Sequence, residues 1–137
     1  MLTNCKELRD KGFSLAHDVN PDTNALTRLF FIHPTTVTMW KQYPNVLLLD
    51  YTYKTNRFNM PLLNICAISR NNKVIQLRLA FLLGETKGDY TWAIRQLRNI
   101  MATSSIQEPV SIVTDRELAL INCIDTLFPE STHLLCR

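Results

Sequence analysis

The chain has 137 residues, the size of one domain or of part of a larger one. Hydrophobic residues make up 46% of it and charged residues 20%, which is typical of a globular protein and excludes disordered and low-complexity classes. Fifteen Lys and Arg against twelve Asp and Glu give a net charge of +3, which permits a nucleic-acid partner without requiring one. The sequence has no apolar run of the roughly 18 residues that span a bilayer, and residues 1–11 do not resemble a secretory signal. We therefore expect a soluble intracellular domain with no membrane partner.

Cysteine spacing agrees with an intracellular protein. The four cysteines lie far apart, with neither the paired spacing of a zinc site nor the compact ladder of a disulfide framework. Most of them are expected to be reduced thiols in the core.

The N-terminal part, residues 1–43, is predicted to be a hairpin and a short helix that lead into the main body. Residues 13–18 and 25–32 are extended runs on either side of a turn at Asn20-Pro21-Asp22. Pro34 suits the first turn of a helix, and Pro44 ends that helix.

The main body, residues 44–137, begins with three strands. Residues 46–53 are hydrophobic without alternation, which predicts a central strand covered on both faces. Residues 62–69 and 74–83 are predicted to follow as strands, with a tight turn at Asn71-Asn72 between them. Short connections indicate that the three strands form an antiparallel meander.

Helices and strands alternate in the remainder of the chain. An amphipathic helix is predicted from Tyr90, with Asp89 as its N-cap, followed by a buried strand over 110–115. A second helix ends at Pro129, and residues 133–136 form a last strand, after which no helix is left to cover it. The order βββ-α-β-α-β predicts an α/β fold: a mixed five-stranded sheet in the three-layer, ribonuclease-H-like arrangement, truncated at its C-terminus.

Two carboxylates are candidates for chemistry. Asp50 follows three leucines inside the predicted central strand, where an ionised group is costly unless it is paired or binds a metal. Asp115 ends a strand just before a helix, the edge at which α/β sheets bind ligands. If their strands are neighbours, the two carboxylates converge and can hold Mg²⁺ or Mn²⁺ for phosphoryl transfer. An alternative for Asp115 stays open, because residues 114–117 also match a helix capping box.

Other polar residues have simpler interpretations. Glu85 follows the third strand and is expected to be a solvated turn residue. His33 and His133 are expected to be hydrogen-bonded structural histidines rather than metal ligands.

Several blocks of the sequence resemble the Mutator-like element (MULE) transposase domain. They cover roughly residues 29–137 and occur in the family's order. The blocks are VLLLDYTYKTN at 46–56 with PLL at 61–63, GET at 84–86 with YTW at 90–92, VTDRELALI at 113–121, and FP at 128–129 with HLLCR at 133–137. Plant transcription regulators domesticated from such transposases share these blocks.

The resemblance implies a DDE-type transposase with a ribonuclease-H-like core, with Asp50 and Asp115 as its first two metal-binding acids. The family's third acid, a Glu on a later helix, has no counterpart, since Glu117 and Glu130 follow Asp115 too closely. Cys136 matches the start of a Cys-x-x-His element whose His would fall beyond the chain.

The implied cofactor is Mg²⁺ or Mn²⁺. The implied partner is DNA, both transposon ends and target, with self-association in a full-length transpososome, a nuclear location and no small-molecule substrate. Lys54, Arg57 and Arg116 are candidates to contact phosphates near the metals, but the lack of a long basic patch favours a solvated surface for them.

The leading hypothesis is therefore a fragment of a transposase that cleaves DNA and transfers strands when full-length, and that is inactive as this chain alone. The alternatives are a domesticated, non-catalytic DNA-associated regulator of the same fold and an inactive transposon relic.

Overall fold

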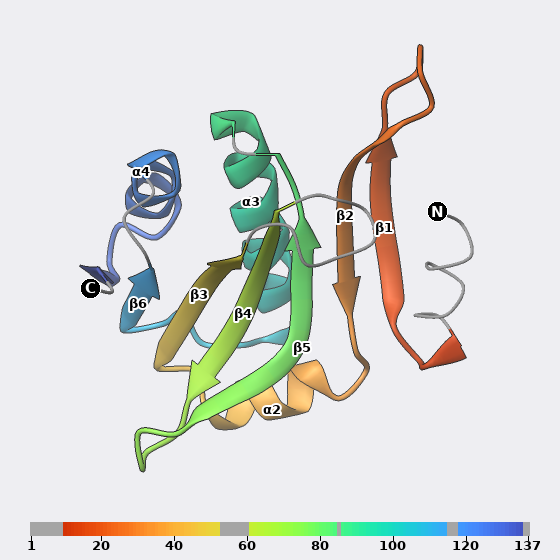
Figure 1. Ribbon diagram of the computed structural model, residues 1–137. Helices are drawn as coiled ribbons and strands as arrows, with labels where there is room; N and C mark the ends of the chain where they lie inside the picture. The colour runs from red at the N-terminus through yellow and green to blue at the C-terminus, as the bar shows by residue number, and fades with distance from the viewer. Residues whose placement is uncertain (1–9, 53–60, 85, 115–117, 136–137) are drawn as a thin grey trace.

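The computed structural model describes residues 10–52, 61–84, 86–114 and 118–135 (Figure 1). The described strands are β1 (Ser14–Val19), β2 (Leu26–Ile32), β3 (Val46–Thr52), β4 (Leu62–Ile68), β5 (Val74–Leu82), β6 (Ser111–Thr114) and β7 (Thr132–Leu135). The described helices are α2 (Thr36–Gln42), α3 (Lys87–Ser104) and α4 (Leu118–Leu127). None of them combines the length and apolar character needed to cross a lipid bilayer.

The strands form one mixed sheet in the order β1-β2-β5-β4-β3-β6-β7. Strands β3, β4 and β5 pair antiparallel, which confirms the predicted meander. Strand β6 pairs parallel with β3 and with β7, as expected for strands joined by helical crossovers. The chain is thus a mixed α/β protein.

The strand count differs from the prediction, because the N-terminal hairpin belongs to the same sheet. Strand β2 pairs antiparallel with β5, so the described sheet has seven strands rather than five. The rings of Phe30 and Phe81 stack across this pairing with centroids 5.0 Å apart. The backbone groups on the outer edge of β5 would otherwise lack partners, and sequence periodicity does not show which edge a hairpin will join.

An ion pair also attaches the hairpin to helix α3. Arg28 Nε on β2 lies 3.0 Å from Asp89 Oδ1 in the first turn of α3. Thr86 is the N-cap of this helix, and its side chain accepts a hydrogen bond from the Asp89 backbone while the Asp89 carboxylate accepts one from the Thr86 backbone. The prediction of Asp89 as N-cap was therefore wrong by three residues, because it occupies the reciprocal position of a capping box.

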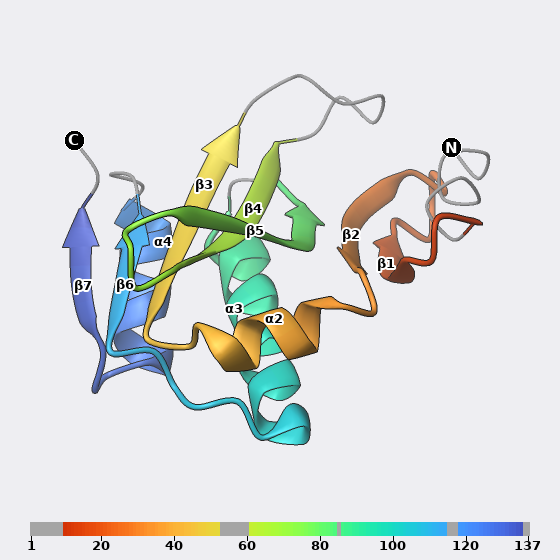
Figure 2. The same ribbon diagram turned by 90° about the horizontal axis from the view of Figure 1, so that it is seen from below.

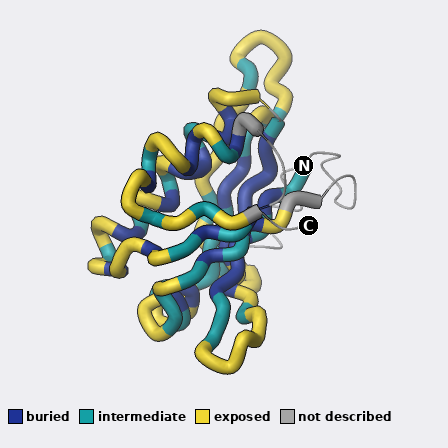
Figure 3. Tube along the Cα trace, turned by 90° about the vertical axis from the view of Figure 1, so that its left-hand side faces the viewer, coloured by how far each residue is buried: buried dark blue, intermediate teal, exposed yellow. Residues whose placement is uncertain are grey.

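The main core lies between the sheet and the helices. Helices α3 and α4 contact each other on one face of the sheet, and Trp40 of α2 belongs to the same buried cluster (Figure 2). The cluster includes seven apolar side chains, spread over the strands and helices, that are at most 2% exposed: Leu47, Leu49, Ile65, Leu79, Leu97, Ile112 and Ile124. Figure 3 shows buried stretches running through the middle of the molecule, with mostly exposed residues in the turns at its edges.

The opposite face of the sheet is also partly apolar. Leu29, Cys66, Ala80 and Leu82 are at most 3% exposed, yet they lie outside the cluster shared with the helices. They alternate along their strands with the residues that face the helices. The central strands are thus apolar on both sides, as expected, but the described helices pack into a single core, so a three-layer arrangement is not confirmed.

Candidate functional site

Asp50 lies near the C-terminal end of the central strand β3, with its side chain exposed. Its neighbour Leu49 is buried against the helices, and alternation along the strand places Asp50 on the opposite face. The prediction that this strand is covered on both faces therefore does not hold at Asp50. An exposed carboxylate does not need a partner to offset burial, and it is accessible to a ligand.

The strands that carry the two candidate acids are neighbours. Strands β3 and β6 pair in parallel, with Leu47 opposite Ile112 and Leu49 opposite Thr114. Leu49 directly precedes Asp50, and Thr114 directly precedes Asp115. Asp115 itself lies outside the described residues, so the distance between the two carboxylates stays a prediction.

Several other candidates also fall outside the described part of the chain. These are Lys54, Arg57, Glu85, Arg116, Glu117 and Cys136, so their predicted roles stay predictions. Glu130 is described and is exposed in the turn between α4 and β7, where it does not approach the end of β3 along the sheet.

The two histidines make the structural contacts expected of them. His33 Nδ1 lies 2.9 Å from the hydroxyl of Thr35. His133 Nε2 shares a 2.8 Å hydrogen bond with the hydroxyl of Thr114, and its Nδ1 lies 3.5 Å from Asp125 Oδ1. Since Thr114 is fully buried, His133 ties the end of β6 to β7 and α4.

Two amide side chains on the strands beside Asp50, Asn64 on β4 and Gln76 on β5, were not predicted from the sequence. Asn64 on β4 is directly opposite Asp50 in the antiparallel ladder. Its Nδ2 donates a 3.0 Å hydrogen bond to Oε1 of Gln76 on β5. The signal that would have revealed Asn64 is a lone amide inside the apolar run Leu62–Ile68.

The electrostatic influence of Asp50 reaches the same face of β4. Burial raises the pKa of the Cys66 thiol, and the negative charge of Asp50 raises it further. Asp50, Asn64 and Cys66 therefore share one local environment. Cys66 is a buried free thiol there, as the sequence predicted for most cysteines.

The donor atoms at this face suit a hard cation. The described residues contain no cluster of three or more His, Cys, Asp or Glu able to hold a metal. Asp50 nevertheless supplies a carboxylate and Asn64 an amide oxygen, the ligand types that Mg²⁺ and Mn²⁺ prefer. The donor types of these two residues therefore fit the implied metal, and Asp50 is the candidate carboxylate among the described residues.

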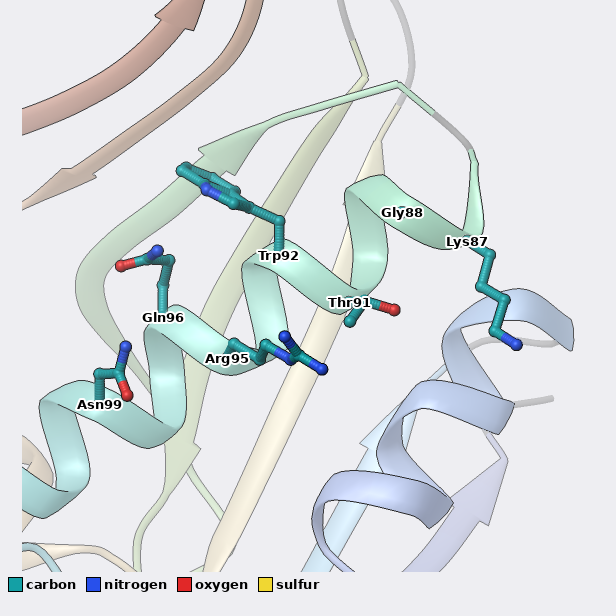
Figure 4. A pocket seen from close by; sticks show the side chains of 7 residues that line it. All are labelled: Lys87, Gly88, Thr91, Trp92, Arg95, Gln96 and Asn99. Atoms are coloured by element: carbon teal, nitrogen blue, oxygen red, sulfur yellow. The ribbon is translucent and has the colours of Figure 1, made fainter.

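A separate hollow runs along the outer side of α3 (Figure 4). Lys87, Thr91 and Arg95 contribute to its lining, and in Figure 4 the side chain of Lys87 extends toward α4. Because α3 covers the face of the sheet opposite to Asp50, this hollow is not part of the candidate site.

Comparisons with known proteins identify the family that this chain matches. A family model described as the MULE transposase domain matches residues 46–137, which confirms the resemblance read from the sequence. Protein FAR1-RELATED SEQUENCE 6 of Arabidopsis thaliana is 29% identical over 135 residues, covering 94% of this chain and 18% of that protein. Protein FAR1-RELATED SEQUENCE 5 of the same plant is 23% identical over 116 residues, covering 85% of this chain and 14% of that protein. A fungal protein named PKS-NRPS hybrid synthetase cheA, from Chaetomium globosum, is 29% identical over 94 residues, which are 69% of this chain and 2% of that protein. The chain thus spans less than a fifth of each of these relatives.

Proposed function

Because this chain belongs to the MULE transposase domain family, we propose that it is the N-terminal part of a DDE-type catalytic core. In the full-length protein this core cleaves DNA phosphodiesters and transfers the freed strand. Its partners are DNA at transposon ends and target sites, and other copies of the full-length chain. Its place of action is the nucleus.

The observation that carries this proposal is the parallel pairing of β3 with β6. It brings Leu49 opposite Thr114, and the residue that follows each of them in the sequence is a candidate acid, Asp50 or Asp115. Carboxylates that follow paired residues of adjacent strands project from the same edge of the sheet, where α/β proteins bind their ligands. The exposure of Asp50 supports the same site.

The roles of the residues follow from their chemistry. Asp50 and Asp115 hold and orient a divalent cation; when bound, Mg²⁺ or Mn²⁺ supplies the positive charge that stabilises the oxygens of a phosphoryl transfer. His133 fixes the hydroxyl of Thr114 and so restrains the end of the strand that leads to Asp115. Lys54, Arg57 and Arg116 contact DNA phosphates in this proposal.

The test is DNA cleavage by the full-length gene product with Mg²⁺ or Mn²⁺. Asp50→Asn and Asp115→Asn should each lower the cleavage rate by roughly 100-fold or more while DNA binding persists. Asp22→Asn, an exposed carboxylate in the β1–β2 turn, is the matched control and should leave the rate unchanged. Cleavage that survives both active-site substitutions would refute the assignment.

A second candidate is a DNA-associated regulator of the same fold that does not cut DNA. The names of the Arabidopsis relatives, which do not designate them as transposases, favour it. The same assay separates the two candidates: a regulator binds DNA with equal affinity in the wild type and the Asn variants, and none of these proteins cleaves it.

A further inference from the structure

Asn64 lies next to Asp50, on the same face of the sheet. The two residues are direct partners in the antiparallel ladder, so their Cβ atoms are about 4.5–5.5 Å apart on the same face of the sheet. Asn64 is half-buried, whereas Asp50 is exposed. Asn64 is the one polar residue of β4, whose other side chains are apolar.

The orientation of the Asn64 amide is set by its nitrogen. Nδ2 donates to Oε1 of Gln76 at 3.0 Å, and it lies 4.0 Å from Sγ of Cys66. Both contacts use the nitrogen and lie on the β5 side or along β4 itself. The amide oxygen therefore points away from β5, and the strand on that other side of β4 is β3, which carries Asp50.

An irregularity in β5 makes this orientation possible. The register between β4 and β5 shifts between Ile65 and Cys66, so that Ile65 pairs with Leu79 but Cys66 pairs with Gln76. Arg78, inside the extra segment of β5, has a positive φ of 57°. The bulge brings Gln76 opposite Cys66 and within reach of Asn64, and bulges of this kind commonly re-aim side chains beside functional sites.

The Asn64 oxygen and the Asp50 carboxylate, both acceptors, then belong to directly paired residues on one face of the sheet. A carboxylate beside an amide would ordinarily attract the N–H of that amide, but here Gln76 holds the nitrogen on the far side. A cation between the two oxygens makes this arrangement favourable. Oxygen ligands of one octahedral Mg²⁺ lie roughly 3 Å apart, a separation that these two side chains can reach.

We propose that the side-chain oxygen of Asn64 is a ligand for the divalent cation held by Asp50, and that Gln76 is the positioning residue that turns this oxygen toward the metal. This inference rests on the proposed function and extends it, because it adds a neutral oxygen ligand from β4 to the carboxylate of Asp50 on β3. Gln76 acts through Asn64 and does not touch the metal.

The experiment measures Mn²⁺ binding to the whole chain by electron paramagnetic resonance, and Mg²⁺ binding by competition. Asn64→Leu, which keeps the approximate size and removes the oxygen, should weaken Mn²⁺ binding several-fold, and Gln76→Leu should weaken it measurably but by a smaller factor. Asn64→Asp adds a charged oxygen at the same place and should tighten binding. Asn99→Leu, which changes an exposed Asn on α3, is the matched control and should not alter the affinity.

The outcomes separate this inference from the function on which it rests. If Asp50→Asn abolishes Mn²⁺ binding but Asn64→Leu and Asn64→Asp both bind like the wild type, Asn64 is not a ligand and the inference fails alone. If Asp50→Asn also binds like the wild type, or the wild type does not bind Mn²⁺, the metal site itself is refuted. Far-UV circular dichroism checks that each variant is folded, and Asn64→Asp, which preserves shape, decides the matter if Asn64→Leu does not fold.

Discussion

Asp89 joins the N-terminal hairpin to helix α3, and its replacement by Ala should be costly. Its carboxylate accepts hydrogen bonds from the Thr86 backbone at 3.2 Å and from the Thr86 hydroxyl at 2.7 Å. Arg28 Nε donates a third at 3.0 Å. The residue is only 9% exposed, so solvent replaces these partners poorly when the carboxylate is removed.

The magnitude follows from these contacts. Loss of one half of a capping box costs about 1 kcal/mol, and loss of a hydrogen bond to a charged group costs about 1.5–3 kcal/mol. Arg28 keeps a contact with Asp18 at 3.6 Å, which offsets part of the second loss. We expect Asp89→Ala to lower the free energy of unfolding by about 2–4 kcal/mol in urea titrations at pH 7.

The same residue predicts a pH dependence. Burial alone would raise the pKa of Asp89, but the hydrogen bonds from Thr86 and Arg28 outweigh it and hold the pKa below its ordinary value of 3.8. A carboxyl with a lowered pKa in the folded state stabilises the fold fully above its unfolded pKa and loses that contribution as the pH falls through the folded pKa. The difference between wild type and Asp89→Ala should therefore be largest at neutral pH and shrink as the pH falls below 3.8.

Two variants of Arg28 test whether the ion pair is the cause. Arg28→Met should destabilise less than Asp89→Ala, and the double variant should show a coupling of at least about 0.5 kcal/mol. Hydrogen exchange in β1 and β2 should accelerate in both single variants, because the hairpin loses its link to α3. A cost for Asp89→Ala below about 0.5 kcal/mol, or a difference that does not change with pH, would refute this reasoning.

Two further changes probe packing and backbone conformation. Leu79→Ala, at a fully buried site between β4 and β2, should lower the free energy of unfolding by about 2–5 kcal/mol, and a cost near zero would contradict the observed core. Ser105 ends α3 with φ 56°, in the left-handed region, so Ser105→Gly should raise the free energy of unfolding by about 1 kcal/mol in the same titration; a loss of stability would show that its side chain matters more than its backbone.

Much of the fold follows from local patterns along the chain. Continuous hydrophobicity over residues 46–49 predicts the central strand, and the helical spacing of Leu97 and Ile124 predicts faces that are indeed buried. These predictions succeed because the period of a helix or strand is a property of neighbouring residues. The parallel direction of β6 also followed, since a helical crossover joins parallel strands, whereas its adjacency to β3 was only a condition of the prediction.

The sequence by itself therefore determined the order of the elements, the core and the two candidate acids, whereas the tertiary structure decided how distant segments meet. No local pattern shows that β2 pairs with β5, that Arg28 reaches Asp89, or that Asn64 is opposite Asp50 with Gln76 holding its nitrogen. The exposure of Asp50 is likewise a matter of which face the helices cover. Contacts of this kind depend on strand register and on a bulge in β5, and a one-residue change of register would move each side chain to the other face of the sheet.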